Sequence, residues 1–166
     1  MSELPKSLIK LLNEVKSADL NDAFHASREL GLLVERHRQD RYGDTSYEML
    51  LSSKELNQLR LTDKIVERLT EELLSVLENH SERSSLVVWP LGKTFKPSVI
   101  DRLLKHLEKN WKDNDILSSE ILVVIYDQSL LDNYWGLIEK IAQEGGNESK
   151  KLASQCLKNR DRLRRT

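Results

Sequence analysis

Two short apolar runs decide which fold class this 166-residue chain can adopt. The runs, Leu86–Trp89 and Ile121–Tyr126, are rich in β-branched residues, as the buried strands of a parallel sheet are. Periodicity alone cannot distinguish a short buried strand from part of a buried helix. Two strands make no stable sheet, and residues 1–80 offer no further strand. We therefore expect an all-α protein, with a β-α-β-α arrangement of residues 84–144 as the alternative.

The rest of the chain carries apolar residues at the three-to-four-residue spacing of amphipathic helices. Such stretches run from Leu8 to Val15, Leu20 to Val34, Ile65 to Leu77, Val99 to Trp111 and Tyr134 to Ile141. In the second stretch we place Leu20 and Phe24 on the buried side, together with Ala23, Leu30 and Val34.

Helix starts are indicated by capping residues. Asp19, Thr62 and the pair Thr45 and Glu48 have side chains that accept hydrogen bonds from first-turn amides, and Pro97 suits the first position of a helix. The length is typical of one domain. We therefore predict a single helical domain over residues 1–166.

An internal repeat indicates how the helices pair in the second half of the chain. The pairs Ser84-Ser85 and Ser118-Ser119 are 34 residues apart. The same offset relates Leu103, Leu104 and Leu107 to Leu137, Ile138 and Ile141. A helix pair of this length buries its apolar face only by stacking on a neighbour. Leu103, Leu104, Leu137 and Ile138 are thus predicted to occupy equivalent core positions.

Residues 84–111 resemble a HEAT-type repeat. Leu91-Gly92 stands where the first helix of such a repeat ends, a short turn follows, and Leu103-Leu104 supplies the paired aliphatics of the second helix. The resemblance implies stacked helix pairs in a HEAT-like α-solenoid over residues 84–166, after an irregular helical part over residues 1–80.

Charge is distributed unevenly along the chain. The formal net charge is −1, but residues 148–166 sum to +5. The segment from residue 113 to residue 144 contains seven acidic residues and a single basic residue, Lys140. Such an acidic field attracts a basic partner at long range and repels nucleic acid.

Six residues of this acidic region are the predicted partner-binding site. They are Asp113, Asp115, Asp127, Asp132, Trp135 and Glu139. Helix ends align along one edge of a solenoid, so we expect the acids to form one stripe beside a partly exposed Trp135. The alternative is that the acids are ordinary solvated surface and that Trp135 belongs to the core.

No catalytic or metal-binding motif stands out in the sequence. The four histidines lack a second His or Cys at metal-ligand spacing, and no nucleophile elbow or phosphate-binding glycine loop is present. Cys156 lies on an apolar helix face, and we expect a buried structural thiol. We accordingly predict no enzyme activity, no catalytic residues, no metal and no cofactor.

The predicted location is the cytoplasm. One cysteine cannot form an intrachain disulfide, and the longest unbroken apolar run is six residues. A membrane span needs about 20 apolar residues. The first residues also lack the basic and then apolar layout of a secretion signal.

In size, class and charge the chain resembles the immunity proteins of bacterial toxin systems. The resemblance implies binding and neutralisation of a basic toxin domain such as a nuclease. A generic helical-repeat scaffold or adaptor is the alternative. A nucleic-acid-binding protein is a third reading, which would use Arg36, His37, Arg38, Arg41 and the basic C-terminal residues.

Overall fold

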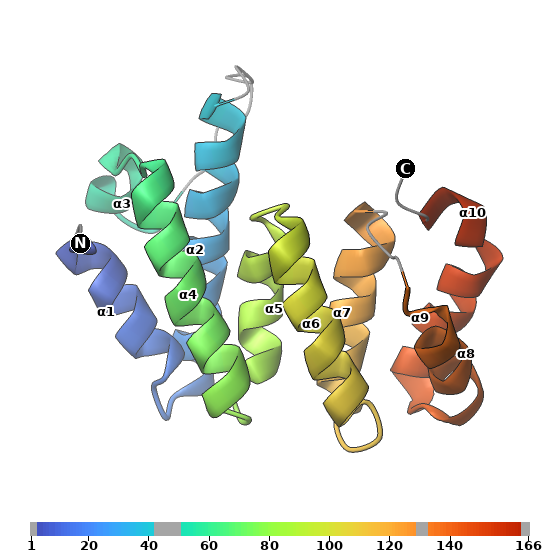
Figure 1. Cartoon of the computed structure of the whole chain (residues 1–166). Helices are drawn as coiled ribbons and strands as arrows, with labels where there is room; N and C mark the ends of the chain where they lie inside the picture. Colours follow the sequence, from blue (N-terminus) through green and yellow to red (C-terminus); the bar gives the residue numbers. More distant parts are fainter. Residues whose placement is uncertain (1–2, 42–50, 129–132, 164–166) are drawn as a thin grey trace. The chain divides into compact units, whose positions relative to one another are not determined.

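The computed structural model describes residues 3–41, 51–128 and 133–163, and all regular structure in them is helical (Figure 1). The helices are α1 (Lys6–Val15), α2 (Leu20–Arg41), α3 (Lys54–Gln58), α4 (Asp63–Asn79), α5 (Ser84–Gly92), α6 (Pro97–Asn110), α7 (Asp115–Gln128), α8 (Trp135–Glu144), α9 (Asn147–Lys158) and α10 (Arg160–Leu163). Both apolar runs lie within helices, α5 and α7, so the all-α prediction is confirmed. No helix in these ranges is long and apolar enough to cross a membrane.

Local signals set the starts of several helices. The Asp19 carboxylate accepts hydrogen bonds from two amides of the first turn of α2, at 2.8 and 3.1 Å. The Thr62 hydroxyl accepts one from the amide three residues later, at 3.3 Å, and begins α4. Pro97 is the first residue of α6, where its missing N–H is not needed. The pair Thr45 and Glu48 lies outside the described residues.

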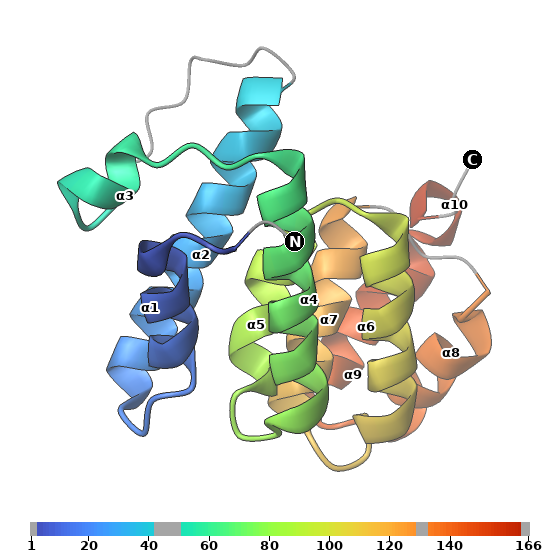
Figure 2. The ribbon, with the colours of Figure 1, turned by 60° about the vertical axis from the view of Figure 1, so that its left-hand side comes forward.

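The helices form two compact units, residues 1–94 and residues 95–166. In the first unit α2 packs on α1 and α5, and α4 packs on α5 and α1. In the second unit α7 packs on α6 and α9, α8 packs on α9, and α10 contacts α7 and α9 (Figure 2). The boundary falls between α5 and α6, within the segment that resembles a HEAT repeat. The single-domain interpretation stays a prediction.

The core of the second unit follows the helical spacing, with one exception. Leu103, Leu104 and Ile138 are fully buried, as predicted. Leu137 is only half-buried, so the prediction that it is a core residue was wrong. Its side chain lies at the border of the face that α8 packs on α9 and reaches a surface groove described below.

The buried face of α2 is narrower than predicted. Ala23, Leu30 and Val34 are buried, whereas Leu20 and Phe24 are 62% and 54% exposed. Phe24 lies at the edge of the arc that Ala23, Leu30 and Val34 define, and Leu20 is the first residue of the helix. Placing Leu20 and Phe24 on the buried side was therefore wrong.

A proline inside α5 shapes the contact between α5 and α2. Pro90 has no N–H, so the carbonyl of Leu86, four residues earlier, receives no helical hydrogen bond from it. The buried hydroxyl of Ser27, on α2, donates to that carbonyl instead. This hydrogen bond between two helices replaces the one that the proline removes from α5.

One helical turn further along α2, a glycine admits an aromatic ring. A Cβ atom on Gly31 would lie 2.3 Å from Cζ3 of Trp89, so only glycine accommodates the indole in this position. The Lys93 ammonium lies 4.8 Å from the centre of the same ring and 3.2 Å from a carboxylate oxygen of Glu35. Ser27, Gly31 and Glu35 follow one another at four-residue intervals, so a single row of α2 faces α5.

Candidate functional site

The structure distributes the predicted partner-binding residues over several places in the second unit. Asp113 lies in the turn before α7, Asp115 is the first residue of α7, and Asp127 lies near its end. At 1.5 Å per residue, Asp115 and Asp127 are about 18 Å apart along the helix. These acids do not gather at one helix end. Asp132 lies outside the described residues.

Asp115 is engaged in holding another helix. Its Oδ1 accepts hydrogen bonds from the amide (3.0 Å) and the hydroxyl (2.5 Å) of Ser149, and its Oδ2 accepts one from the amide of Glu148 (3.2 Å). A Cβ on Gly146 would lie 2.3 Å from the Asp115 Cγ, so glycine permits this approach. The Ser149 hydroxyl and both amides lower the Asp115 pKa. Asp115 therefore caps the N-terminus of α9.

Trp135 and Glu139 both contact a cation of the same chain, Arg160. The Arg160 guanidinium lies 4.9 Å from the centre of the Trp135 ring and 3.7 Å from a carboxylate oxygen of Glu139. Trp135 itself is half-buried. Because Arg160 already provides the cation that a basic partner would bring, a partner would have to displace it. The binding role of both residues stays a prediction.

A groove lies between α6 and α8 in the second unit. Two pockets, about 540 and 530 Å³ in volume, share Glu108 and Leu137 and so continue into one another. We call this surface the α6–α8 groove. Its lining consists of Asp101, Lys105, Glu108, Lys109, Trp111, Lys112, Asp113, Asn133, Tyr134, Gly136, Leu137, Lys140 and Glu144. Of the predicted site residues that the structure describes, Asp113 alone lines these two pockets.

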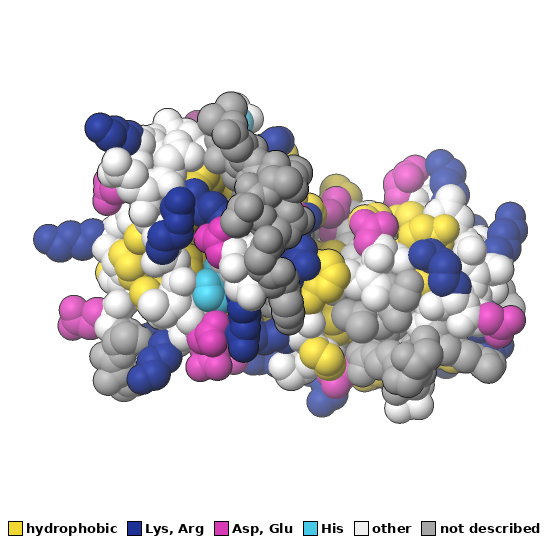
Figure 3. Space-filling model, turned by 90° about the horizontal axis from the view of Figure 1, so that it is seen from above, with side chains coloured by type: hydrophobic (Ala, Val, Ile, Leu, Met, Phe, Trp, Pro, Cys, Tyr) yellow, Lys and Arg dark blue, Asp and Glu magenta, His cyan; other side chains and the backbone are white. Residues whose placement is uncertain are grey.

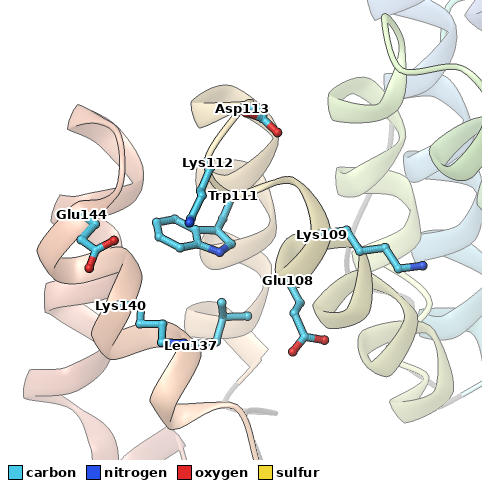
Figure 4. Close-up of a pocket in the computed structure, with 8 residues that line it drawn as sticks. All are labelled: Glu108, Lys109, Trp111, Lys112, Asp113, Leu137, Lys140 and Glu144. Carbon is cyan, nitrogen blue, oxygen red and sulfur yellow. The ribbon is translucent and has the colours of Figure 1, made fainter.

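Two apolar side chains lie on the floor of the groove among charged residues, and one of them, Trp111, is only 7% exposed. Trp111 and Leu137 extend into the space between the two helices (Figure 4). The Lys112 ammonium lies 5.3 Å from the centre of the Trp111 ring. Four carboxylates and four lysines line the groove, so its formal charge is zero. Burial, followed by the nearby Glu108 and Asp101, raises the pKa of Tyr134 at one end.

One residue of the groove, Gly136, has free space where a side chain would begin. Gly136, in the first turn of α8, lines it, and a Cβ added there would meet no atom within 4 Å. Sequence reasoning missed the groove because it placed Leu137 in the core. The available signal was Gly136, a glycine inside a helix with no turn to require it.

Basic residues of α2, considered above for nucleic-acid binding, make contacts within the chain. The Arg36 guanidinium donates to the carbonyls of Leu56, Asn57 and Leu59. The Arg41 guanidinium is 3.0 Å from the Asp63 carboxylate. On the face seen in Figure 3, the described Lys and Arg side chains are interspersed with Asp and Glu. Nucleic-acid binding needs clustered positive charge, and the face in Figure 3 shows no such cluster; the interpretation as a nucleic-acid-binding protein stays a prediction.

Groups suited to metal or nucleophilic chemistry are few in the described ranges. No cluster of three or more His, Cys, Asp or Glu residues that could hold a metal occurs there. The Nε2 of His37 is 3.0 Å from the Asp63 carboxylate, and Arg41 rather than a third ligand joins this pair. Cys156 is fully buried as expected, and burial raises the pKa of its thiol to about 11. A thiol with so high a pKa is a poor nucleophile at neutral pH.

Comparisons with protein-family models, with curated proteins and with solved structures find no match to this chain.

Proposed function

We propose that this chain is a non-enzymatic protein that binds another protein through the α6–α8 groove. The observation that carries the proposal is the groove itself, with Trp111 and Leu137 on its floor and charged side chains on its rim. An apolar centre within a polar rim is the usual composition of a protein interface, and Leu137 offers the more exposed of the two apolar side chains. Along α8 the groove is about 15 Å long, which matches about three turns of a partner helix.

A HEAT-like stacking of helix pairs is part of the proposal. Near the start of α5, α7 and α9 stands a buried serine: Ser84, Ser118 and Ser149. The spacings are 34 and 31 residues. In the second unit the alternate helices α7 and α9 pack directly on each other, as equivalent helices of adjacent repeats do. This placement supports a repeat with α6 and α8 as the second helices, parted by the groove.

Among proteins of this kind, we propose an immunity protein that neutralises a basic toxin domain in the cytoplasm. Three features support this: the helical structure, the excess of six negative charges between residues 113 and 144, and the free, buried thiol of Cys156, which suits a reducing compartment. Most of these acids lie outside the formally neutral groove, so they would attract a basic partner from a distance rather than pair with it in the groove. A generic scaffold or adaptor would use the same groove. A neighbouring gene that encodes a large protein with a toxic C-terminal domain would favour the immunity protein over the scaffold.

Substitutions of Gly136 test whether a partner binds in the groove. Partners would be captured from the source cell, purified, and measured for direct binding to the full chain. Gly136→Trp would fill the groove from a position that no other atom approaches, so we expect the affinity to fall about tenfold or more. Gly136→Ala is the matched control and should bind as the wild type does. A partner that binds Gly136→Trp and Leu137→Asp without loss would show that the groove is not the binding surface.

A further inference from the structure

A second surface, on the outer side of α7, combines apolar and acidic side chains. Ile116, Glu120, Val123 and Asp127 recur at intervals of four, three and four residues and so share one face of the helix. Ile116 is 67% and Val123 is 38% exposed. The residues on the other side, including Leu117, Ile121 and Ile125, are buried. We call the four exposed or half-buried residues the α7 outer face.

The acidic residues between 113 and 144 can be sorted by what they contact. Asp115 caps α9, and Glu139 pairs with Arg160. Asp113 and Glu144 line the α6–α8 groove among its lysines. Of the acids that the structure describes, Glu120 and Asp127 remain, and neither carboxylate has a hydrogen bond or ion pair with a described residue. The α7 outer face therefore carries two carboxylates that no described side chain neutralises.

Glu120 lies in an unfavourable environment for an unpaired carboxylate. Its side chain is half-buried, and burial raises its pKa. Partial removal of a carboxylate from water costs free energy unless a cation compensates for it. A cation placed beside Glu120 by a partner would remove this cost, so the site favours Lys or Arg.

A cation of α10, Arg162, lies beside this face of α7. The Arg162 guanidinium stacks on the Tyr126 ring, 4.5 Å from its centre, and approaches the Tyr126 carbonyl at 3.5 Å. Arg162 therefore shows that a guanidinium can be accommodated beside α7. Arg162 contacts Tyr126 rather than the carboxylate of Glu120 or Asp127.

We propose that the α7 outer face binds a basic amphipathic helix of another protein. This inference goes beyond the proposed function, because it assigns a second surface, separate from the α6–α8 groove, and names the chemistry of what binds there. Glu120 and Asp127 are seven residues apart, about 10 Å along the helix. Lys or Arg side chains two turns apart on a partner helix match that distance. An apolar side chain between them would cover Val123, and one a turn beyond Glu120 would cover Ile116. The arrangement is that of helices which pair through an apolar seam flanked by opposite charges.

The test uses three synthetic helical peptides of about 18 residues, long enough to span α7. They share one leucine face and carry Lys, Gln or Glu at the flanking positions. Binding to the full chain is measured by fluorescence anisotropy at low and high salt. We expect the Lys peptide to bind and to weaken as salt rises, and the Gln and Glu peptides to bind at least about tenfold less tightly.

Variants then locate the binding site. Glu120→Lys with Asp127→Lys, and separately Ile116→Ser with Val123→Ser, should each weaken the Lys peptide about tenfold or more. The isosteric pair Glu120→Gln with Asp127→Asn should weaken it too, with little risk to folding. Glu55→Lys with Glu67→Lys changes the net charge by the same amount on exposed residues of α3 and α4 and should have no more effect than bulk charge does.

The proposal is overturned if the Lys peptide does not bind, if the Gln peptide binds equally well, or if the Glu55 and Glu67 control weakens binding as much as the α7 variants do. Gly136→Trp separates this result from the proposed function. A captured partner that is lost by Gly136→Trp, with no binding of the Lys peptide, would retain the groove and remove only the α7 outer face.

Discussion

Replacing Gly31 by alanine should destabilise the protein even though alanine is the better helix former. In a helix interior, Gly→Ala is worth up to about 1 kcal/mol of stabilisation. The added Cβ would lie 2.3 and 2.5 Å from Cζ3 and Cε3 of Trp89, whereas carbon atoms in contact are roughly 3.5–4.0 Å apart. The indole or the helix must therefore shift by about 1 Å or more.

The neighbours of Trp89 make that shift costly. The Lys93 ammonium lies over the ring and pairs with Glu35, so movement of the indole disturbs both contacts. Overpacking of this kind costs about 1–3 kcal/mol. With 37% of its surface exposed, Trp89 has some freedom to rotate outward, which argues against a higher figure. After the gain in helix propensity, we expect a net loss of about 1 kcal/mol.

Urea unfolding followed by far-ultraviolet circular dichroism measures the change, with an unchanged m-value as the condition for comparison. Gly136→Ala is the matched control. No atom lies within 4 Å of its Cβ, so it should stabilise by about 0.5 kcal/mol. In a Trp89→Ala background, Gly31→Ala should also stabilise, because the atoms it would meet are gone. If Gly31→Ala stabilises the wild type as Gly136→Ala does, the tight contact with Trp89 is not real.

Two further predictions concern the second unit. Leu103→Ala should lower the free energy of unfolding by about 2–5 kcal/mol, because Leu103 is fully buried. Leu137→Ala, at the half-buried position in the groove, should lower it by less than about 1.5 kcal/mol. Equal losses in urea unfolding would contradict the burial described above. Asp115→Ala should cost about 1 kcal/mol at pH 7, as the loss of a helix cap does. Because the folded-state pKa of Asp115 is lowered, its contribution is present above the ordinary carboxylate pKa and is lost as pH falls through the lowered value. The difference between wild type and variant should therefore shrink in acid, while the exposed Asp113→Ala should show little difference at any pH.

The sequence alone determined which segments are helical and where several of them begin. The spacing of Leu103 and Leu104 and the caps at Asp19 and Thr62 predicted their helices because helical hydrogen bonds and caps join residues at most four positions apart. Periodicity could not assign α5 and α7, whose apolar runs suit a strand equally well. Their helical structure was inferred from the absence of further strands.

Tertiary structure decided how the residues of those helices are used. Leu137 and Ile138 are adjacent in sequence, but only Ile138 is fully buried, because the packing of α8 on α9 leaves the side facing α6 uncovered. Asp115 was predicted to meet a partner, and that role stays a prediction. What the structure adds is that Asp115 caps α9, through the amide of Ser149, 34 residues away. Helix formation depends on near neighbours in the chain, whereas the exposure and hydrogen bonding of a side chain depend on which distant helices pack against it. That is why the helices could be predicted from the sequence, whereas the α6–α8 groove and the capping role of Asp115 could not.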